Sequence, residues 1–446
     1  MRLNSFTKQP IYTHEGAPSS RVPPLVQLRR LTLACMLWED TFYVDGKTIT
    51  TKIEEACNNV KPSDIVDIAL EAHQKGLLRH MPLFLLLQAI KHGSRVKDAI
   101  PIICNRPDQM TELLALYWKD GRKSIPAQMK KGLALTFQQF DEYQLAKYNR
   151  DTPVKLRDIL FMCHAKPINA EQEALWKRLI DKKMAKPDTW ETKLSAGKDK
   201  KESFEELLEK GKMGKLAIVR NLRNMQESGV PKELVRSQLA KSGRPLLPFQ
   251  CLAAARMCPQ WEDIIDEGMI KAMQGKEKLP GVTSVLVDVS GSMSNSVSGK
   301  SQMSLMDAAC GLAILLRECC DNLDIFTFSN NLALVPSRHG MALRDAIINS
   351  QPHNGTNLGR ALKHLDSNKK PEIDIERIIV ITDEQSADIP PHFPAKYAYI
   401  LNIAPYQNGI KNNGQWHTIT GFSEASIDYI RENEVASLSN SKRIVK

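Results

Sequence analysis

The sequence predicts two folds in succession, a series of short α-helices followed by an open α/β sheet. From Pro24 to about Met273, apolar residues recur at three- and four-residue spacing, which is the period of amphipathic helices. After Gly281, β-prone runs such as Val282–Val287 alternate with helical ones, as they do in α/β domains. A chain of 446 residues is long enough for two or three such domains.

The N-terminal residues 1–23 are polar and rich in proline, so we expect an extended arm there. Residues 24–275 are expected to form helices that stack in pairs of the HEAT or armadillo kind, because so many short helices cannot share one simple bundle. The expected helices are Leu25–Trp38, Ser63–Lys75, Met81–His92, Asp108–Trp118, Pro126–Tyr143, Pro153–Cys163, Ala170–Lys183, Ser203–Lys210, Gly214–Met225, Lys232–Ala240 and Pro248–Met257.

Residues 281–440 are expected to form a Rossmann-like α/β domain with helices on both faces of the sheet. The continuous apolar run Val282–Val287 is typical of a strand that is covered on both faces. Further strands are expected at Leu323–Phe328, Leu332–Val335, Arg377–Ile381 and Tyr397–Ile403, and helices at Met303–Cys320, Met341–Ser350, Leu358–Ser367 and Glu424–Glu432.

Oxygen-bearing side chains follow the expected strands, where open sheets of this kind bind ligands. Asp288, Ser290 and Ser292 end the first strand, and Asp383 comes directly after the strand that ends near Thr382. Thr356 lies in a loop just before a helix. Two carboxylates and three hydroxyls, without Cys or His, favour a hard divalent cation, which we expect to be Mg²⁺, with Mn²⁺ or Ca²⁺ as alternatives.

These five residues resemble the metal-ion-dependent adhesion site of von Willebrand factor A domains, whose pattern is Asp-x-Ser-x-Ser with a distant Thr and Asp. All five positions match, in the order of the family pattern. The resemblance implies a von Willebrand factor A-like domain over 281–440. It also implies a metal ion with one coordination position for a carboxylate of a partner protein.

The basic excess of the chain lies in its N-terminal part. The net charge is +10, yet residues 281–446 hold 15 Lys and Arg against 17 Asp and Glu. A polyanion partner is therefore expected for the first 280 residues, nucleic acid before membrane. There is no apolar run of membrane-spanning length, no signal-peptide pattern, and an odd number of cysteines, so we expect a cytoplasmic protein with reduced thiols.

A second resemblance lies in the helical part. The segments Ser124–Ala134, Leu145–Tyr148, His164–Pro167, Thr189–Glu191, Met213–Met225 and Arg244–Phe249 resemble the TROVE domain of Ro autoantigen-type proteins, over roughly residues 24–275. Those proteins also end in a von Willebrand factor A domain. The resemblance implies a ring of HEAT-like helices, closed within one monomer by that domain. It implies that Y-like small RNA binds the outer surface and that single-stranded 3′ ends of misfolded non-coding RNAs enter a central hole.

The family resemblance also selects candidate RNA-binding residues. Lys147 and His164 have the spacing of basic residues that face Y RNA in the family, whose intervening arginine would fall at Asp151, so the neighbouring Arg150 is a shifted substitute. With Lys155, Arg157 and Lys166 they surround one expected helix, and cations near helix ends are ordinary phosphate contacts. Further candidates are Lys130, Lys131, Arg220 and Arg223.

We therefore expect an RNA-binding protein without catalytic residues, which acts in RNA quality control. In bacterial relatives a Y RNA tethers an exoribonuclease such as polynucleotide phosphorylase, so a role as degradation adaptor is implied. One alternative is a metal-dependent protein-interaction scaffold without a specific RNA role. A less favoured one is a metal-dependent nuclease, against which the lack of a recognisable general base and of a Walker phosphate loop counts.

Overall fold

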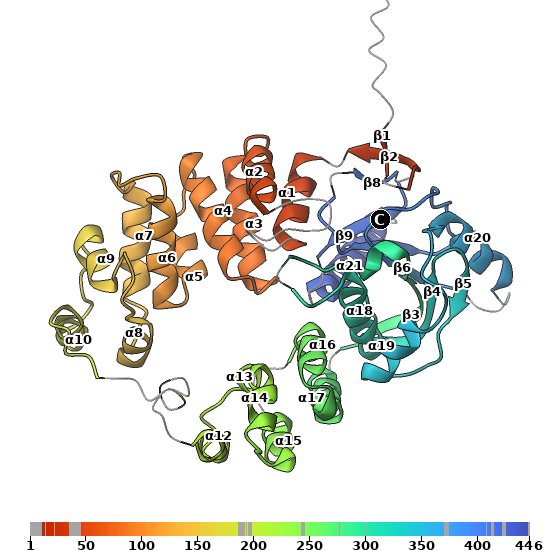
Figure 1. Ribbon diagram of the computed structural model, residues 1–446. Coiled ribbons are helices and arrows are strands. Elements are labelled where there is room, and N and C mark those ends of the chain that lie inside the picture. Colours follow the sequence, from red (N-terminus) through yellow and green to blue (C-terminus); the bar gives the residue numbers. More distant parts are fainter. Residues whose placement is uncertain are drawn as a thin grey trace, which may run out of the picture. The chain divides into compact units, whose positions relative to one another are not determined.

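A computed structural model gives the fold of the chain (Figure 1). It describes residues 11–13, 15–21, 23–34, 46–185, 192, 194, 199–241, 246–275, 277–299, 301–369, 374–406, 408–411, 414–421 and 425–444. Parts of the sequence motifs, namely Thr189–Glu191 and Arg244–Pro245, lie outside these residues. The chain forms two compact units, residues 50–212 and residues 1–49 with 213–446. The boundaries between these units, after residues 49 and 212, differ from the predicted domain boundaries near residues 23 and 275.

Residues 50–212 form an all-helical unit. Its helices are α2 (Gly46–Cys57, whose first turn belongs to the other unit), α3 (Pro62–Gln74), α4 (His80–Lys91), α5 (Ala99–Ile103), α6 (Pro107–Tyr117), α7 (Ala127–Phe137), α8 (Glu142–Tyr148), α9 (Leu156–Cys163), α10 (Ala170–Ile180) and α12 (Lys200–Glu209). The helices pack in series, α3 on α4, α4 on α6, α5 on α7 and α7 on α9. Fully buried residues such as Leu83, Leu114 and Ile159 form the core between them.

The predicted helix Pro126–Tyr143 is wrong, because the chain breaks between α7 and α8. Asp141 caps α8: its carboxylate accepts a hydrogen bond from the amide of Gln144 at 2.7 Å, and the Gln144 side chain accepts one from the amide of Asp141 at 3.1 Å. A capping residue followed by Gln or Glu three positions later is a signature of a helix N-terminus, and here it marks the start of α8. Periodicity alone did not reveal the break, because Phe137 and Phe140 keep the apolar spacing.

The second unit begins its helical part with α13 (Lys215–Arg220), α14 (Leu222–Glu227), α15 (Lys232–Ala240), α16 (Pro248–Met257) and α17 (Glu262–Met273). The single helix predicted over Gly214–Met225 is therefore two, separated at Asn221, whose side-chain amide donates to the carbonyl of Ala217 at 2.8 Å. Helices α2, α5 and α17 were not predicted at all.

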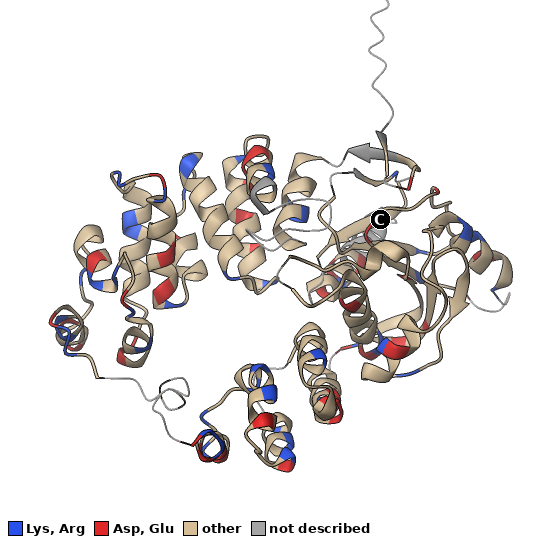
Figure 2. Cartoon of the chain, in the orientation of Figure 1, with Lys and Arg blue, Asp and Glu red and all other residues tan. Residues whose placement is uncertain are grey.

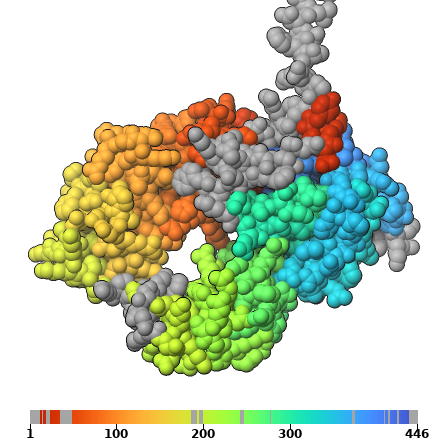
Figure 3. All heavy atoms as spheres, viewed as in Figure 1, coloured from red at the N-terminus to blue at the C-terminus, as the bar shows by residue number. Residues whose placement is uncertain are grey.

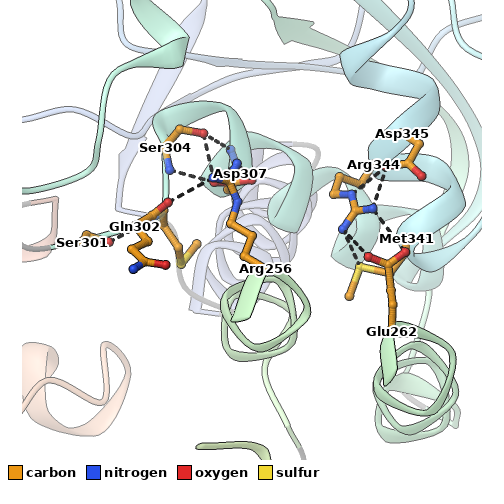
Figure 4. Close-up of polar contacts among 10 residues, drawn as sticks. Arg256, Glu262, Ser301, Gln302, Ser304, Asp307, Met341, Arg344 and Asp345 are labelled. Atoms are coloured by element: carbon orange, nitrogen blue, oxygen red, sulfur yellow. Dashed lines mark hydrogen bonds and ion pairs between the residues drawn. The ribbon is translucent and has the colours of Figure 1, made fainter. Parts of the chain in front are cut away.

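Two ion pairs attach α16 and α17 to the helices of the α/β part (Figure 4). Arg256 of α16 contacts Asp307 of α18 (Leu305–Cys319) at 2.8 Å, and Glu262 of α17 contacts Arg344 of α19 (Gly340–Ile348) at 3.0 Å. Asp266 also accepts a hydrogen bond from the amide of Met341 at 2.9 Å. In the space-filling view the surface of α16 and α17 continues into that of the α/β part (Figure 3).

The α/β part is built on a six-stranded mixed sheet in the order β5-β4-β3-β6-β7-β9. Its strands are β3 (Leu279–Asp288), β4 (Cys320–Phe328), β5 (Leu332–Leu334), β6 (Arg377–Thr382), β7 (Tyr397–Asn402) and β9 (Trp416–Thr420). All neighbours are parallel except β4 and β5. The sequence predicted every strand of this sheet but β9, in which exposed His417 and half-buried Thr418 and Thr420 interrupt the apolar pattern.

Helices cover both faces of this sheet, as the continuous apolar strands require. On one face α20 (Leu358–Asn368) packs through Leu358, Leu362 and Leu365 against Leu286, Val380 and Ile400. On the other face α18 contacts β3, β4 and β6. There α21 (Ala425–Ile444) places Glu434 against Arg377 in a buried bidentate ion pair. The helix predicted over Glu424–Glu432 is thus longer at its C-terminal end.

The predicted N-terminal arm contains two strands, β1 (Ile11–Tyr12) and β2 (Pro18–Arg21), which form a small sheet with β8 (Asn408–Ile410). Thr13 donates a hydrogen bond to the carbonyl of Ser386 at 2.7 Å, so the strands lie beside the α/β part. Helix α1 (Pro24–Leu33) lies in the same unit. No helix among the described residues is long and apolar enough to cross a membrane.

Candidate metal centre and basic surface

The loops that carry the predicted metal ligands meet at one edge of the sheet. Strands β3 and β6 are parallel and Val287 pairs with Ile381, so Asp288 lies beside Thr382 and close to Asp383. Thr382 donates a hydrogen bond to the Asp288 carboxylate at 2.6 Å. The register of two central strands therefore positions both carboxylates, as the sequence predicted from the order of the strands.

Hydrogen bonds join the remaining ligand loops to this pair. Asp288 accepts a hydrogen bond from the amide of Ser290 at 2.9 Å, and the hydroxyls of Ser290 and Ser292 are 3.3 Å apart. The amide of Gly291 donates to the carbonyl of Asn354 at 2.9 Å, which brings in the loop of Thr356. The carbonyl of Thr356 in turn accepts from the amide of Ala387 at 2.7 Å, four residues after Asp383.

The carboxylates of Asp288 and Asp383 are buried, and burial raises the pKa of each. Burial and then the charge of the neighbouring Asp288 raise the pKa of Asp383 to about 7, although hydrogen bonds from the Gln385 amide and Ser292 lower it. Burial also raises the pKa of Asp288, although hydrogen bonds from Ser290 and Thr382 oppose the shift. Two neighbouring buried carboxylates with raised pKa values favour a site for a cation.

The donor set fits a hard divalent cation. Asp383 has one carboxylate oxygen that is buried and finds no hydrogen-bond partner among the described residues. Asp288, Ser290, Thr356 and Asp383 are almost completely buried, whereas Ser292 is half-buried. Among the described residues no three His, Cys, Asp or Glu side chains form a metal-binding group. The candidate site has only two such side chains, Asp288 and Asp383, and its other three ligands are hydroxyls. Oxygen ligands of this kind suit Mg²⁺.

Sequence reasoning missed three residues of this site. Thr382 orients Asp288, and the backbone amide of Gln385 donates to Asp383 at 3.0 Å. Glu15, in the turn between β1 and β2, is near enough for its charge to raise the pKa of Asp288. Thr382 could have been found, because it directly precedes Asp383 at the end of a buried strand. Glu15 could not, since nothing in its local sequence connects the arm to the sheet.

Eight of the ten predicted RNA-binding residues lie on the 50–212 unit. Lys130 and Lys131 are on α7, Lys147 is on α8, and the others flank or begin α9, namely Arg150, Lys155, Arg157, His164 and Lys166. All are exposed or half-buried. The Gln138 side chain donates to the carbonyl of Lys166 at 2.8 Å, so the segment after α9 lies against the end of α7.

Acidic side chains are interspersed among these cations (Figure 2). Lys155 forms an ion pair with Asp151 at 2.7 Å, and Arg157 lies 3.8 Å from Asp158. The hydrogen bond from Lys155 lowers the pKa of Asp151, and the positive charges of Lys182 and Arg157 lower it further. Lys182 is thus another cation of this surface. Asp151 forms an ion pair with Lys155, so the side chains of this surface that are better placed to contact phosphates include Lys147, Arg150, His164 and Lys166.

His164 has a defined backbone position at the end of α9. It adopts a left-handed conformation with φ of 52° and is exposed. Its neighbour Phe161 is 58% exposed, and Tyr143 is 51% exposed with the Lys147 ammonium 5.8 Å from the centre of its ring. Exposed aromatic rings beside cations are the side chains on which unpaired bases stack.

Arg220 and Arg223 lie in the other unit, on α13 and α14. Both are exposed, and Arg223 is 3.6 Å from Glu227. They flank Asn221, where one helix gives way to the next, so they do not share a single helix as the sequence predicted. The structure therefore places the ten candidate RNA-binding residues in one group of eight and one of two.

Comparison with known proteins agrees with this architecture. Residues 177–244 match the TROVE domain. The structure resembles the crystal structure of the Deinococcus radiodurans Ro (RSR) protein with a TM-score of 0.56 and 16% sequence identity, covering 90% of this chain and 97% of that one. Among curated proteins, none matches the sequence. The matched TROVE segment includes Arg220 and Arg223.

The TROVE match over residues 177–244 agrees with the resemblance seen in the sequence, and the likeness to the Deinococcus protein shows a similar fold. The likeness to the Deinococcus protein extends over nearly the whole of both chains, so it covers the helices and the mixed sheet together.

Proposed function

We propose that this Ro-type TROVE protein binds structured RNA on the surface formed by α7, α8 and α9. The observation that carries the proposal is the TROVE match together with cations gathered on consecutive helices that lie outside the acidic α/β part. RNA binding by such a surface derives most of its affinity from phosphate contacts and therefore depends strongly on salt. Exposed Phe161 and Tyr143 add stacking positions for unpaired bases.

The proposal extends to the kind of RNA and its fate. We propose a Y-like small RNA as the ligand of this surface, and single-stranded 3′ ends of misfolded non-coding RNAs as ligands of a central hole in a closed monomer. An exoribonuclease such as polynucleotide phosphorylase, tethered through the Y-like RNA, would then degrade them. These parts come from the family resemblance, and they make the protein an adaptor of RNA quality control rather than an enzyme.

We further propose that Asp288, Ser290, Ser292, Thr356 and Asp383 hold Mg²⁺. The support is the donor chemistry and the buried oxygen of Asp383 without a partner among the described residues. A bound divalent ion would neutralise both buried carboxylates and offer an open position to a carboxylate of a partner protein. In this proposal the ion serves folding and interaction. Cleavage of RNA that disappears in the variant Asp288→Ala would instead favour a metal-dependent nuclease.

The experiment that tests the function is recovery of bound RNA from the native host. The protein is purified, free nucleic acid is removed, and the remaining RNA is sequenced. A discrete set of structured small RNAs would support the proposal and identify the ligand. Well-folded protein that carries no RNA, or a random pool, would contradict it and direct attention to protein partners of the metal site.

The double variant Lys147→Ala with His164→Ala is expected to weaken binding of the recovered small RNA at least tenfold, measured by filter binding at 0.1 M salt. Both side chains are on the proposed surface, and each lost phosphate contact lowers the salt dependence of binding as well as the affinity. The matched control is Lys119→Ala with His92→Ala, which removes the same residue types elsewhere in the same unit. Equal binding by the two double variants would place the RNA on another surface.

A further inference from the structure

A cavity of about 500 Å³ lies within the helical part of the second unit, between α13, α14 and α16. Its walls are mainly apolar and include Leu216, Val219, Phe249 and Met257. Met303, in the loop that precedes α18, lines it from the α/β part. The volume is within the range of sites that bind small molecules. The metal site and the surface of α7 to α9 contribute no residue to it.

Two cations lie on this cavity, Arg220 and Arg223. Arg223 is 3.6 Å from Glu227, an exposed contact that contributes little. No described carboxylate forms an ion pair with Arg220. The cavity therefore combines an apolar interior with a guanidinium that has no described anionic partner. A ligand that matches it has a flat apolar part and an anionic group, since guanidinium groups recognise phosphates by paired hydrogen bonds.

The apolar walls are held in place by contacts of their own. Phe249 packs on Gly311 of α18 so closely that a Cβ atom at Gly311 would lie 2.7 Å from the ring. Arg256 fixes the end of α16 next to Met257, because it contacts Asp307 at 2.8 Å and donates to the carbonyl of Gln302 at 3.1 Å (Figure 4). Because Gln302 directly precedes Met303, the contacts of Arg256 position both Met257 and Met303 on the walls of the cavity. A preformed cavity costs a ligand little reorganisation.

We infer that this cavity binds one unstacked nucleotide of single-stranded RNA, with its base between Phe249 and Met257 and its phosphate on Arg220 and Arg223. Aromatic and thioether side chains are suitable contacts for a base, and arginine for the phosphate that follows it. The inference rests on the proposed function, since the same chemistry would also fit a free nucleotide. It adds to that function an apolar site for one nucleotide, separate from the surface of α7 to α9.

The test uses the full chain and a 12-residue oligoadenylate that carries one 2-aminopurine, whose fluorescence rises when the base leaves its stack. Ala253 lines the cavity, so Ala253→Trp fills it, and Arg220→Met with Arg223→Met removes the charges. Both are expected to weaken binding at least tenfold and to abolish the fluorescence rise. The arginine variant should also lower the slope of log affinity against log salt by about 0.7 for each lost contact.

Lys271→Met is the matched control, because Lys271 is exposed in the same unit and does not line the cavity. It should bind the oligonucleotide within about twofold of the parent chain. If Ala253→Trp does not fold, as thermal melting would reveal, the arginine variant still decides. Oligonucleotide binding that both variants leave unchanged overturns the inference but leaves RNA binding intact. A parent chain that binds no RNA at all contradicts the proposed function instead. Adenosine monophosphate that binds more tightly than the oligonucleotide would assign the cavity to a free nucleotide.

Discussion

Arg30→Met is expected to lower the free energy of unfolding of the second unit by about 3–5 kcal/mol. Arg30, on α1, forms an ion pair with Glu384 at 2.7 Å, and both side chains are 2% exposed. Its guanidinium also donates to the carbonyl of Tyr406 at 3.4 Å. Methionine fills much of the volume but leaves the Glu384 carboxylate buried without its cation, which is the costly part of the change.

The same ion pair is expected to affect the proposed metal site as well as stability. Glu384 follows Asp383 directly, has a left-handed backbone with φ of 61°, and accepts a hydrogen bond from the amide of Ile410 at 3.0 Å. Without Arg30, this loop loses a contact that fixes it. We therefore expect weaker stabilisation by Mg²⁺ in the Arg30→Met variant than in the parent chain.

Urea unfolding followed by circular dichroism measures the effect. The control Arg360→Met, at an exposed position of α20, should change the free energy of unfolding by less than about 0.5 kcal/mol. The double variant Arg30→Met with Glu384→Leu should recover much of the loss, because no buried charge is then left alone. An Arg30→Met variant as stable as the parent would mean that water reaches the Glu384 carboxylate in place of Arg30.

The arrangement of the five candidate metal ligands could be predicted because it follows from local sequence. A continuous apolar run ending in Asp288 and another ending before Asp383 are two parallel strands, and parallel strands bring their carboxyl ends to one edge. The contribution of the arm could not be predicted in this way. Thr13 contacts Ser386 across 373 positions of sequence, and Arg30 contacts Glu384 across 354, and no periodicity in the sequence carries such pairings.

In the helical part, most elements could be predicted from the sequence but the positions of the candidate functional residues could not. Its helices were largely predictable from the spacing of apolar residues, yet their ends were not, since a capping box at Asp141 and the break at Asn221 override the period. The helix ends determine on which helix each basic residue lies. The single helix expected over Gly214–Met225 would hold both Arg220 and Arg223, whereas the break places them on two helices around a cavity. The cavity itself was invisible in the sequence because residues of three helices and a distant loop form it.

The metal-free protein is expected to lose stability as pH rises from about 4 to about 7. The pKa of Asp383 is raised from 3.8 to about 7 in the folded chain, chiefly by burial and then by the charge of Asp288. Between these two values the folded state binds more protons than the unfolded state, so the free energy of unfolding falls as pH rises. This sign is opposite to that of a carboxylate in an ion pair, whose contribution is lost on acidification.

Magnesium should reverse this dependence. A divalent ion binds the ionised carboxylates, so at pH 8 free Mg²⁺ at a hundred times its dissociation constant adds about 2.7 kcal/mol to the stability. That corresponds to a rise in melting temperature of roughly 4–6 °C for a unit of this size. At pH 5 the proton on Asp383 competes with the ion, and the same Mg²⁺ concentration should raise the melting temperature much less.

Asp383→Asn separates this effect from all other titrating groups. The amide cannot ionise, so the metal-free variant should be more stable than the parent at pH 8 and nearly equal to it at pH 5, while losing its response to Mg²⁺. Asp321→Asn, at an exposed position of the same unit, should keep both the pH dependence and the Mg²⁺ response of the parent. If the parent melts at the same temperature with and without Mg²⁺ at pH 8, the five oxygen ligands do not form a metal site. In that case a stabilised Asp383→Asn variant would show that the paired carboxylates carry a cost in stability that no ion relieves, and Glu15 would only add to it.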